Sequence, residues 1–188
     1  LTPTADKTIA EIHLYQTPSG KSLLAKRYVS APNDWKVTVR TAANDIVQAI
    51  TGTPSVFKSQ IAAVCDRSGK KEVYVFDFDG SNPQQVTQHR STTVSPAWNR
   101  DGTRIAYSVY NRHEDNTKNL DLFEFDFNKK LLRLLSNKTG INSGANYDPK
   151  KNRIALTLSH LGNPEIFLLD PDSREATRLT QSIGVDVD

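Results

Sequence analysis

The sequence predicts an α+β segment over residues 1–56, followed by an all-β region of β-propeller blades over residues 57–188. Two observations indicate the blades. A short apolar run recurs at Ile61, Ile105 and Ile154, 44 and 49 residues apart. Each run opens a unit of short strands, and units of four strands at roughly 40 to 50 residues are typical of propeller blades. A third observation is that residues 1–56 lack this repeat and carry hairpin and helix patterns instead.

The first element is a hairpin. Residues 8–15 and 22–29 alternate with period two, and residues 17–20 (Thr-Pro-Ser-Gly) between them have turn chemistry. We therefore expect two antiparallel strands.

The second element is one amphipathic helix of roughly four to five turns. Its apolar positions recur at spacings of three and four, at Val39, Ala43, Ile46, Val47 and Ile50. Residues 32–34 (Pro-Asn-Asp) offer capping side chains, and Gly52 and Pro54 end the pattern. A hairpin and a helix of this size bury too little apolar surface to be stable alone. We expect residues 1–56 to be the carboxyl-terminal part of an α/β amino-terminal domain that begins upstream, with a linker over residues 53–58.

The repeated units follow. In each, a second strand ends in Asp, at Asp77, Asp126 and Asp170, and a turn leads to a third strand. These Asp side chains are expected to fix the turns by hydrogen bonds to the backbone. The middle unit is five residues longer than the first, and the polar stretch 111–119 accommodates them. We expect that stretch to be a solvent-facing loop.

An aromatic residue precedes a turn in two units. Trp98 and Tyr147 each lie seven residues before an Ile-Ala pair, and Asp101-Gly102 is a hairpin-turn signal. The aromatic residues are expected to fill the gap between neighbouring sheets. The chain holds about two and a half such units, whereas propellers close with about four to eight blades. We therefore expect the sequence to be part of a longer protein.

Composition excludes several classes of protein. No apolar run is long enough to span a membrane. The single cysteine, Cys65, excludes an internal disulfide and is expected to be a buried apolar residue. The net charge is +3, and the basic pairs Lys70-Lys71, Lys129-Lys130 and Lys150-Lys151 each fall beside a predicted turn. We interpret these pairs as solvated turns and expect no nucleic-acid partner.

The sequence carries no signal for catalysis. It lacks a Gly-x-Ser-x-Gly elbow, a His-Glu-x-x-His motif and a phosphate-cradling glycine loop. The histidines are scattered, at His13, His89, His113 and His160, without metal-ligand spacing. We expect no catalytic residue, no metal and no cofactor.

The chain resembles the TolB family of the Tol-Pal system over nearly all 188 residues. The resemblance rests on the repeats at residues 95–107 (Ser-Pro-Ala-Trp-x-x-Asp-Gly-x-x-Ile-Ala-Tyr), 162–167 and 179–180, and on the join from residues 23–28 through the helix to residues 57–62. Two turns depart from the family pattern: residues 148–152 read Asp-Pro-Lys-Lys-Asn, and Asn99-Arg100 replaces Ser-Pro. Both still satisfy turn chemistry.

The resemblance implies an α/β domain followed by a six-bladed propeller, no enzymatic activity and a periplasmic location. It implies binding to the peptidoglycan-associated lipoprotein Pal, and contacts with TolA and other Tol proteins through parts not in this sequence. Bacteriocins are further implied partners. The implied role is outer-membrane integrity, envelope constriction at cell division and protein import.

In the family, Pal is held where a blade's outer strand connects to the next blade's inner strand. Here the corresponding connections are residues 89–94, 139–144 and 182–188. Loops on a rigid scaffold can present several groups to one partner. The expected contact residues are Thr92, Thr93, Ile141, Asn142, Ser143 and Asp186, with His89 and Arg90 at the rim.

Two alternatives stay open at this point. Prolyl-oligopeptidase-type serine peptidases carry propellers with similar repeats, which gate a hydrolase domain elsewhere in their chain. The second alternative is a stand-alone propeller that binds another envelope protein or a glycan. The hairpin and helix before the first blade favour the TolB interpretation.

Overall fold

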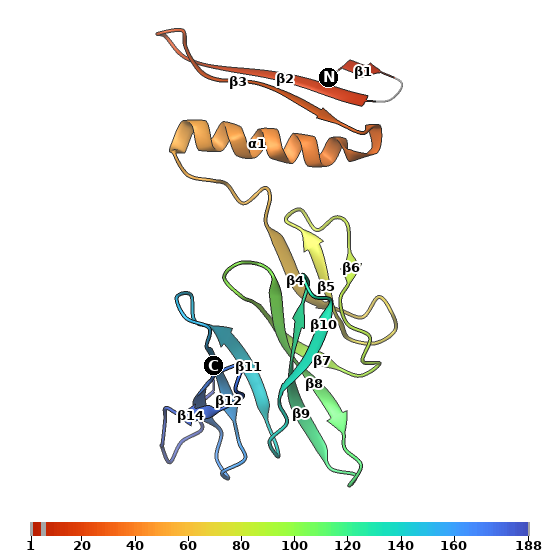
Figure 1. The fold of residues 1–188 in the computed structure, drawn as a ribbon, viewed down its shortest axis with the longest axis vertical. Coiled ribbons are helices and arrows are strands. Elements are labelled where there is room, and N and C mark those ends of the chain that lie inside the picture. The colour runs from red at the N-terminus through yellow and green to blue at the C-terminus, as the bar shows by residue number, and fades with distance from the viewer. Residues whose placement is uncertain (1, 5–6, 188) are drawn as a thin grey trace. The chain divides into compact units, whose positions relative to one another are not determined.

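A computed structural model describes residues 2–4 and 7–187 and divides the chain into two compact units. One unit holds the chain up to residue 61 together with residues 77–81, and the other holds residues 62–76 and the chain from residue 82. Antiparallel sheets make up most of the chain, with one α-helix in the described residues (Figure 1). Among these residues, no helix has the length and apolarity that a membrane span requires. The assignment of residues 1–56 to an α/β domain stays a prediction.

The first unit contains the predicted hairpin and helix. Strands β1 (Thr2–Thr4), β2 (Lys7–Gln16) and β3 (Lys21–Ser30) form a sheet in that order. A 3-10 turn, η1 (Pro32–Asp34), leads into α1 (Trp35–Thr51). Gly52 ends the helix in the left-handed region, and its N–H donates to the Gln48 carbonyl at 2.9 Å. The prediction of a capping side chain is wrong, because the Asp34 side chain makes no capping hydrogen bond.

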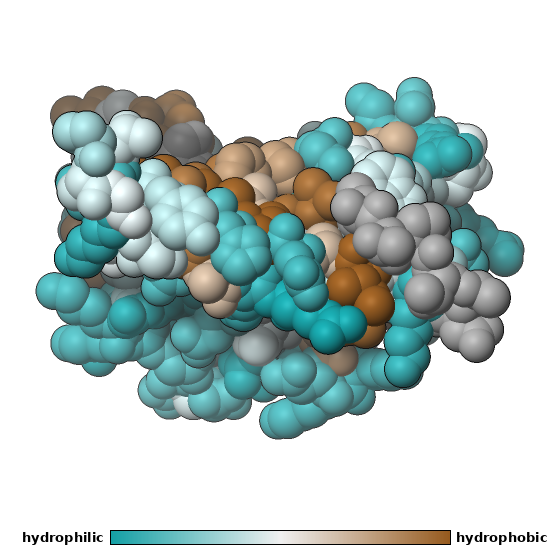
Figure 2. Space-filling model, turned by 90° about the horizontal axis from the view of Figure 1, so that it is seen from above, coloured by the Kyte–Doolittle hydropathy of each residue, from teal (hydrophilic) through white to brown (hydrophobic). Residues whose placement is uncertain are grey.

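The helix packs on the hairpin, and its fully buried side chains are small or polar. Its buried side chains are Thr38, Ala42 and Asn44. In the predicted apolar stripe, Val39 and Ile50 are 43% and 63% exposed, whereas Ala43, Ile46 and Val47 are half-buried. Periodicity therefore predicted the helix and part of its buried face. Figure 2 shows a band of apolar side chains, bordered by polar ones, over the outer face of the hairpin.

One buried hydroxyl ties β3 to the helix. Tyr28 Oη donates to Asp45 Oδ2 at 2.9 Å, and Lys26 Nζ lies 2.7 Å from the same oxygen. Burial, with the neighbouring Asp45 carboxylate, raises the pKa of Tyr28 to about 12.

Three antiparallel sheets follow, which we call blades 1, 2 and 3. Blade 1 comprises β4 (Gln60–Cys65), β5 (Glu72–Asp77) and β6 (Gln84–Gln85). Blade 2 comprises β7 (Thr93–Trp98), β8 (Arg104–Arg112), β9 (Lys118–Asp126) and β10 (Leu131–Ser136). Blade 3 comprises β11 (Asn142–Tyr147), β12 (Ile154–Leu158), β13 (Glu165–Leu169) and β14 (Ala176–Arg178). The predicted propeller blades are confirmed.

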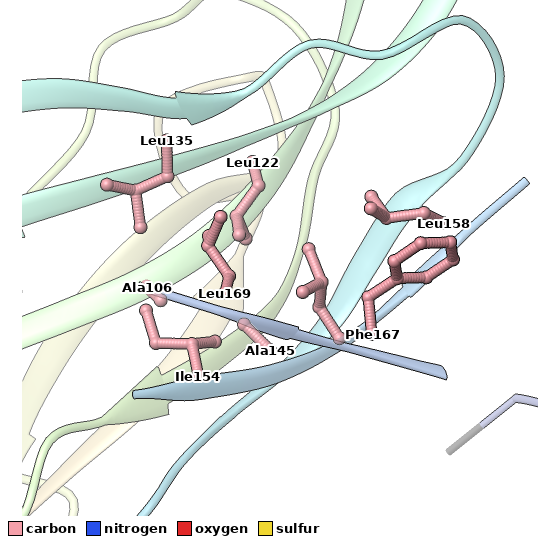
Figure 3. Packing of buried hydrophobic residues seen from close by; sticks show 9 residues of the cluster. Ala106, Leu122, Leu135, Ala145, Ile154, Leu158, Phe167 and Leu169 are labelled. Carbon is pink, nitrogen blue, oxygen red and sulfur yellow. The ribbon is translucent and has the colours of Figure 1, made fainter. Parts of the chain in front are cut away.

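Strand β8 is buried on both faces because successive side chains point to opposite sides of a sheet. Ile105, Tyr107 and Val109 belong to a cluster with residues of blade 1. Ala106 belongs to a second cluster, which joins blade 2 to blade 3. Figure 3 shows Leu122 and Leu135 of blade 2 meeting side chains of blade 3 in this cluster.

The two aromatic residues pack against these clusters, as predicted. Trp98 lies against the first cluster and stacks on Phe127, with ring centroids 5.3 Å apart. Tyr147 packs against the second, and its hydroxyl donates to Glu124 Oε2 at 2.8 Å. Glu124 is fully buried and also receives hydrogen bonds from the Arg133 guanidinium. Blades 2 and 3 therefore share a hydrogen bond to a buried carboxylate as well as apolar surface.

The expected turn role of the repeated Asp residues is confirmed at Asp126 and Asp170. Asp126 Oδ1 accepts backbone N–H groups of two following residues at 3.0 Å, and Asp170 Oδ1 does the same at 2.8 and 3.1 Å. The Asp77 carboxylate accepts a hydrogen bond from the Arg40 guanidinium, within the first unit.

The prediction that the whole stretch 111–119 faces solvent is wrong. Asn119 is buried and contacts Asp121 Oδ1 at 3.2 Å. Asp121 Oδ2 accepts from Asn111 at 2.9 Å and lies 3.0 Å from His113 Nε2. The polar composition did not indicate exposure here, because the polar side chains hydrogen bond to the buried carboxylate of Asp121.

Truncating the inter-blade core should cost stability. Ile154→Ala removes a fully buried side chain between blades 2 and 3, and the cavity left should lower the free energy of unfolding by about 2–5 kcal/mol. Urea unfolding of the intact protein measures this cost. The control is Leu161→Ala, at a side chain that is 58% exposed, which should change stability by less than about 0.5 kcal/mol. Equal losses in both variants would contradict this account of the core.

Candidate partner-binding face

Three chain segments lie at the same end of the blades and form what we call the connection face: residues 86–92 between β6 and β7, residues 137–141 between β10 and β11, and residues 179–187 after β14. Each segment, or the strand residue that directly follows it, is hydrogen bonded to the β4–β5, β8–β9 or β12–β13 hairpin of the blade before it. The Thr93 N–H donates to the Lys71 carbonyl at 2.8 Å, the Leu120 N–H to Gly140 at 3.1 Å, and the Asp186 N–H to Pro164 at 3.0 Å. A backbone hydrogen bond to a hairpin therefore anchors each of the three connections.

The eight predicted contact residues divide into exposed and buried groups. Arg90 is exposed and the Ile141 residue is 38% exposed. His89, Thr92, Ser143 and Asp186 are half-buried. Thr93 and Asn142 are fully buried, so their side chains do not reach the surface. Their role at this face stays a prediction. Because both side chains are buried, that role would be to shape the face rather than to touch a partner.

Three of these residues are not in connections. Thr93 belongs to β7, and Asn142 and Ser143 belong to β11. The inner strands begin earlier than the sequence suggested, because their first residues pair with β8 and β12 before a bulge. The bulge places Ser95 in the left-handed region with φ 52°. A strand start with polar side chains therefore had the appearance of a loop.

Asn142 organises the second connection. Its Oδ1 accepts from Ser136 Oγ at 2.6 Å and from the Lys138 N–H at 3.0 Å. Its Nδ2 donates to the carbonyls of Leu120 at 3.0 Å and Lys138 at 2.6 Å. All four bonds of the amide are used, which explains why this side chain is buried.

Gly140 in this connection cannot carry a side chain. Its φ is 96°, and a methyl group there would overlap with Ser159 Oγ. That hydroxyl accepts the Ile141 N–H at 2.8 Å. The close approach fixes the backbone from which Ile141 projects.

Two buried carboxylates, missed in the sequence, hold the other connections. Glu72 Oε1 accepts the Arg90 N–H at 2.7 Å, and Glu165 Oε1 accepts the Ser182 N–H at 3.1 Å. Both side chains are buried. The sequence does contain a signal for them, since each Glu lies five residues before a repeated Asp and fifteen before a Thr.

His89 is packed rather than free. Its ring lies 4.9 Å from the Phe123 ring centroid, and its Nε2 lies 3.0 Å from Tyr107 Oη. Burial lowers the pKa of His89, and the nearby Glu72 charge opposes this effect. The His89 side chain packs beneath the connection, whereas the Arg90 residue is exposed to solvent.

A pocket of about 540 Å³ opens beside the first connection. It lies among the ends of β4 and β7 and is lined by Val64, Cys65, Asp66, Lys71, Thr93, Val94 and Ser95. Cys65 is half-buried there. In the part of the chain that the structure describes, no group of three or more His, Cys, Asp or Glu side chains could hold a metal ion.

The Glu165 contacts should make stability depend on pH. The Thr180 hydroxyl above all, with Arg178 and the Ser182 N–H, lowers the pKa of Glu165 from its ordinary 4.5 to about 2, against the effect of burial. A lowered folded-state pKa contributes stability that is complete above 4.5 and is lost as the pH falls toward 2. Urea unfolding at pH 7, 4.5 and 3 should show Glu165→Gln less stable than the wild type at pH 7, with a gap that narrows on acidification. A gap independent of pH would contradict this assignment.

A family model described as the TolB beta propeller domain matches residues 47–188. The Tol-Pal system protein TolB of Desulfosudis oleivorans is 34% identical over 174 residues, covering 93% of this chain and 38% of that protein. The TolB homolog of Chlorobaculum tepidum is 33% identical over 186 residues, covering 98% of this chain and 41% of that protein. The chain thus spans less than half the length of these relatives.

Solved structures agree with these matches. The crystal structure of TolB from Acinetobacter baumannii matches with a TM-score of 0.81 and 26% identity, over 98% of this chain and 46% of that one. The tricorn protease matches with a TM-score of 0.51 at 10% identity, a likeness that concerns the fold alone. The TolB match extends over the hairpin and helix as well as the blades, and the family model covers most of the chain. This chain therefore belongs to the TolB β-propeller family.

Proposed function

We propose that this chain is part of a non-enzymatic periplasmic scaffold of the Tol-Pal system that binds the lipoprotein Pal through the connection face. Its relatives are named as Tol-Pal system proteins, which supports a role in that system. In this role the intact protein maintains the outer membrane and assists envelope constriction at cell division. TolA, other Tol proteins and bacteriocins are further proposed partners.

The observation that supports binding is that the backbone of the connection face is hydrogen bonded to buried side chains. Buried side chains fix the connections from beneath, through Glu72, Asn142 and Glu165. A surface ordered before binding loses less conformational entropy when a partner docks. The face can therefore act as a preformed template.

The exposed side chains on this face suit a protein partner. Ile141 supplies apolar surface and Arg90 supplies a cation with several donors. Interfaces commonly combine a few such anchors with a polar surround. Among the described residues, the Arg90 guanidinium makes no hydrogen bond or ion pair, and the Ile141 residue is exposed. Both side chains are therefore available to a partner.

Substitutions on the connection face should weaken Pal binding. Arg90→Glu and Ile141→Asp each place a carboxylate where we propose a contact, and each should raise the Kd for Pal about tenfold or more, a loss of about 1.4 kcal/mol. Titration calorimetry of the intact protein with the soluble domain of Pal measures the change.

The matched control is Lys150→Glu. Lys150 is exposed in the turn between β11 and β12, at the opposite end of the strands from the connection face. The control should leave the Kd unchanged. Pal binding that is equally affected at all three positions would contradict the proposed face. Labelling of the intact protein by a serine-hydrolase probe, with no Pal binding, would instead identify a peptidase.

A further inference from the structure

A hydrogen-bonded relay runs from the backbone of β5 to the first connection. The Val73 N–H donates to Thr87 Oγ1 at 2.9 Å, and Thr87 Oγ1 donates to Glu72 Oε2 at 2.5 Å. The other carboxylate oxygen of Glu72 accepts the Arg90 N–H at 2.7 Å. The relay thus joins a central strand to the residue that the connection exposes.

Blade 3 repeats the relay at equivalent positions. The Ile166 N–H donates to Thr180 Oγ1 at 2.9 Å, and Thr180 Oγ1 donates to Glu165 Oε2 at 2.5 Å. Glu165 Oε1 accepts the Ser182 N–H at 3.1 Å. Two independent copies of one arrangement, 93 residues apart, indicate a shared structural requirement at this end of the blades.

The relay requires a group that only accepts hydrogen bonds. The threonine hydroxyl already accepts from the backbone, so its single proton is directed at the carboxylate. The connection N–H is directed at the second oxygen. A glutamine would place an NH₂ group against one of these donors, so one hydrogen bond would be lost.

Blade 2 reaches the same result with different residues. Asp121 takes the place of the glutamate, but its shorter side chain contacts Asn111, His113 and Asn119 instead. The amide oxygen of Asn142 accepts both the hydroxyl of Ser136 and the Lys138 N–H. An acceptor for one hydroxyl and one connection N–H is therefore retained in all three blades.

The first relay holds an unfavourable backbone conformation. Arg90 has a φ of 58°, in the left-handed region that non-glycine residues seldom adopt. The charge-assisted bond to Glu72 offsets that cost and directs the exposed side chain. Without the bond, the connection would sample other conformations.

We propose that Glu72 and Glu165 are positioning residues of the partner-binding face, which hold Arg90 and Ser182 in their binding conformations. This inference rests on the proposed function for the identity of the partner. It predicts that the carboxylates affect Pal affinity without touching Pal.

Hydrogen exchange tests the positioning step without any partner. Glu72→Gln should speed exchange of the Arg90 amide about tenfold or more and leave Ser182 unchanged, and Glu165→Gln should do the reverse. Glu124→Gln is the matched control, because Glu124 is equally buried but contacts Arg133 and Tyr147 rather than a connection. All three are compared in the intact protein, with thermal unfolding to confirm folding. Thr87→Val and Thr180→Val break each relay with nearly the same volume and serve if a glutamine variant fails to fold. Unchanged exchange in folded relay variants would overturn the proposal.

Calorimetry with the soluble domain of Pal tests the consequence. The Kd should rise about tenfold in Glu72→Gln and Glu165→Gln and stay unchanged in Glu124→Gln. If the wild type binds Pal and all three variants bind equally, the positioning role is overturned while the proposed function stands. If the wild type does not bind Pal, the proposed function fails, and the exchange rates still decide whether the carboxylates hold the connections.

Discussion

A propeller blade of short strands must bury both of its faces, and this constraint organises the whole repeated region. Strand β8 places Ile105 against blade 1 and Ala106 against blade 3, so one alternating sequence serves two cores. Burying a polar side chain in this layer costs free energy unless its hydrogen bonds are satisfied. Glu124 is an example, because it is fully buried and paired with Arg133 and Tyr147.

The same constraint extends to the ends of the blades, where strands give way to connections. Backbone N–H groups there have no ladder partner, and buried side chains of the blade supply acceptors for them. Glu72 and Glu165 do this with a carboxylate, and Asn142 with an amide. The core of each blade and the shape of the connection face are therefore parts of one hydrogen-bonded structure, while Arg90 and Ile141 remain outside it.

Much of the architecture could be predicted because periodicity reports it directly. The Ile-Ala runs, the strand-ending Asp residues and the aromatic residues before turns recur, and repetition identified the blades. Details that depend on neighbours were harder to predict. Val39 and Ile50 fit a helical apolar stripe but are exposed, and Asn119 sits in a polar stretch but is buried. The connections were found, but Thr93, Asn142 and Ser143 proved to lie in strands.

The sequence alone determined the order of elements, the repeat length and the family resemblance, because each is encoded by residues close together in the chain. Tertiary structure alone decided which polar residues anchor the connection face. Glu165 and Ser182 are 17 positions apart and meet only when β13 pairs with β14. A glutamate at the start of a strand has the same local pattern whether it is solvated or buried. Its partners, and hence its role, come from segments that the fold brings together.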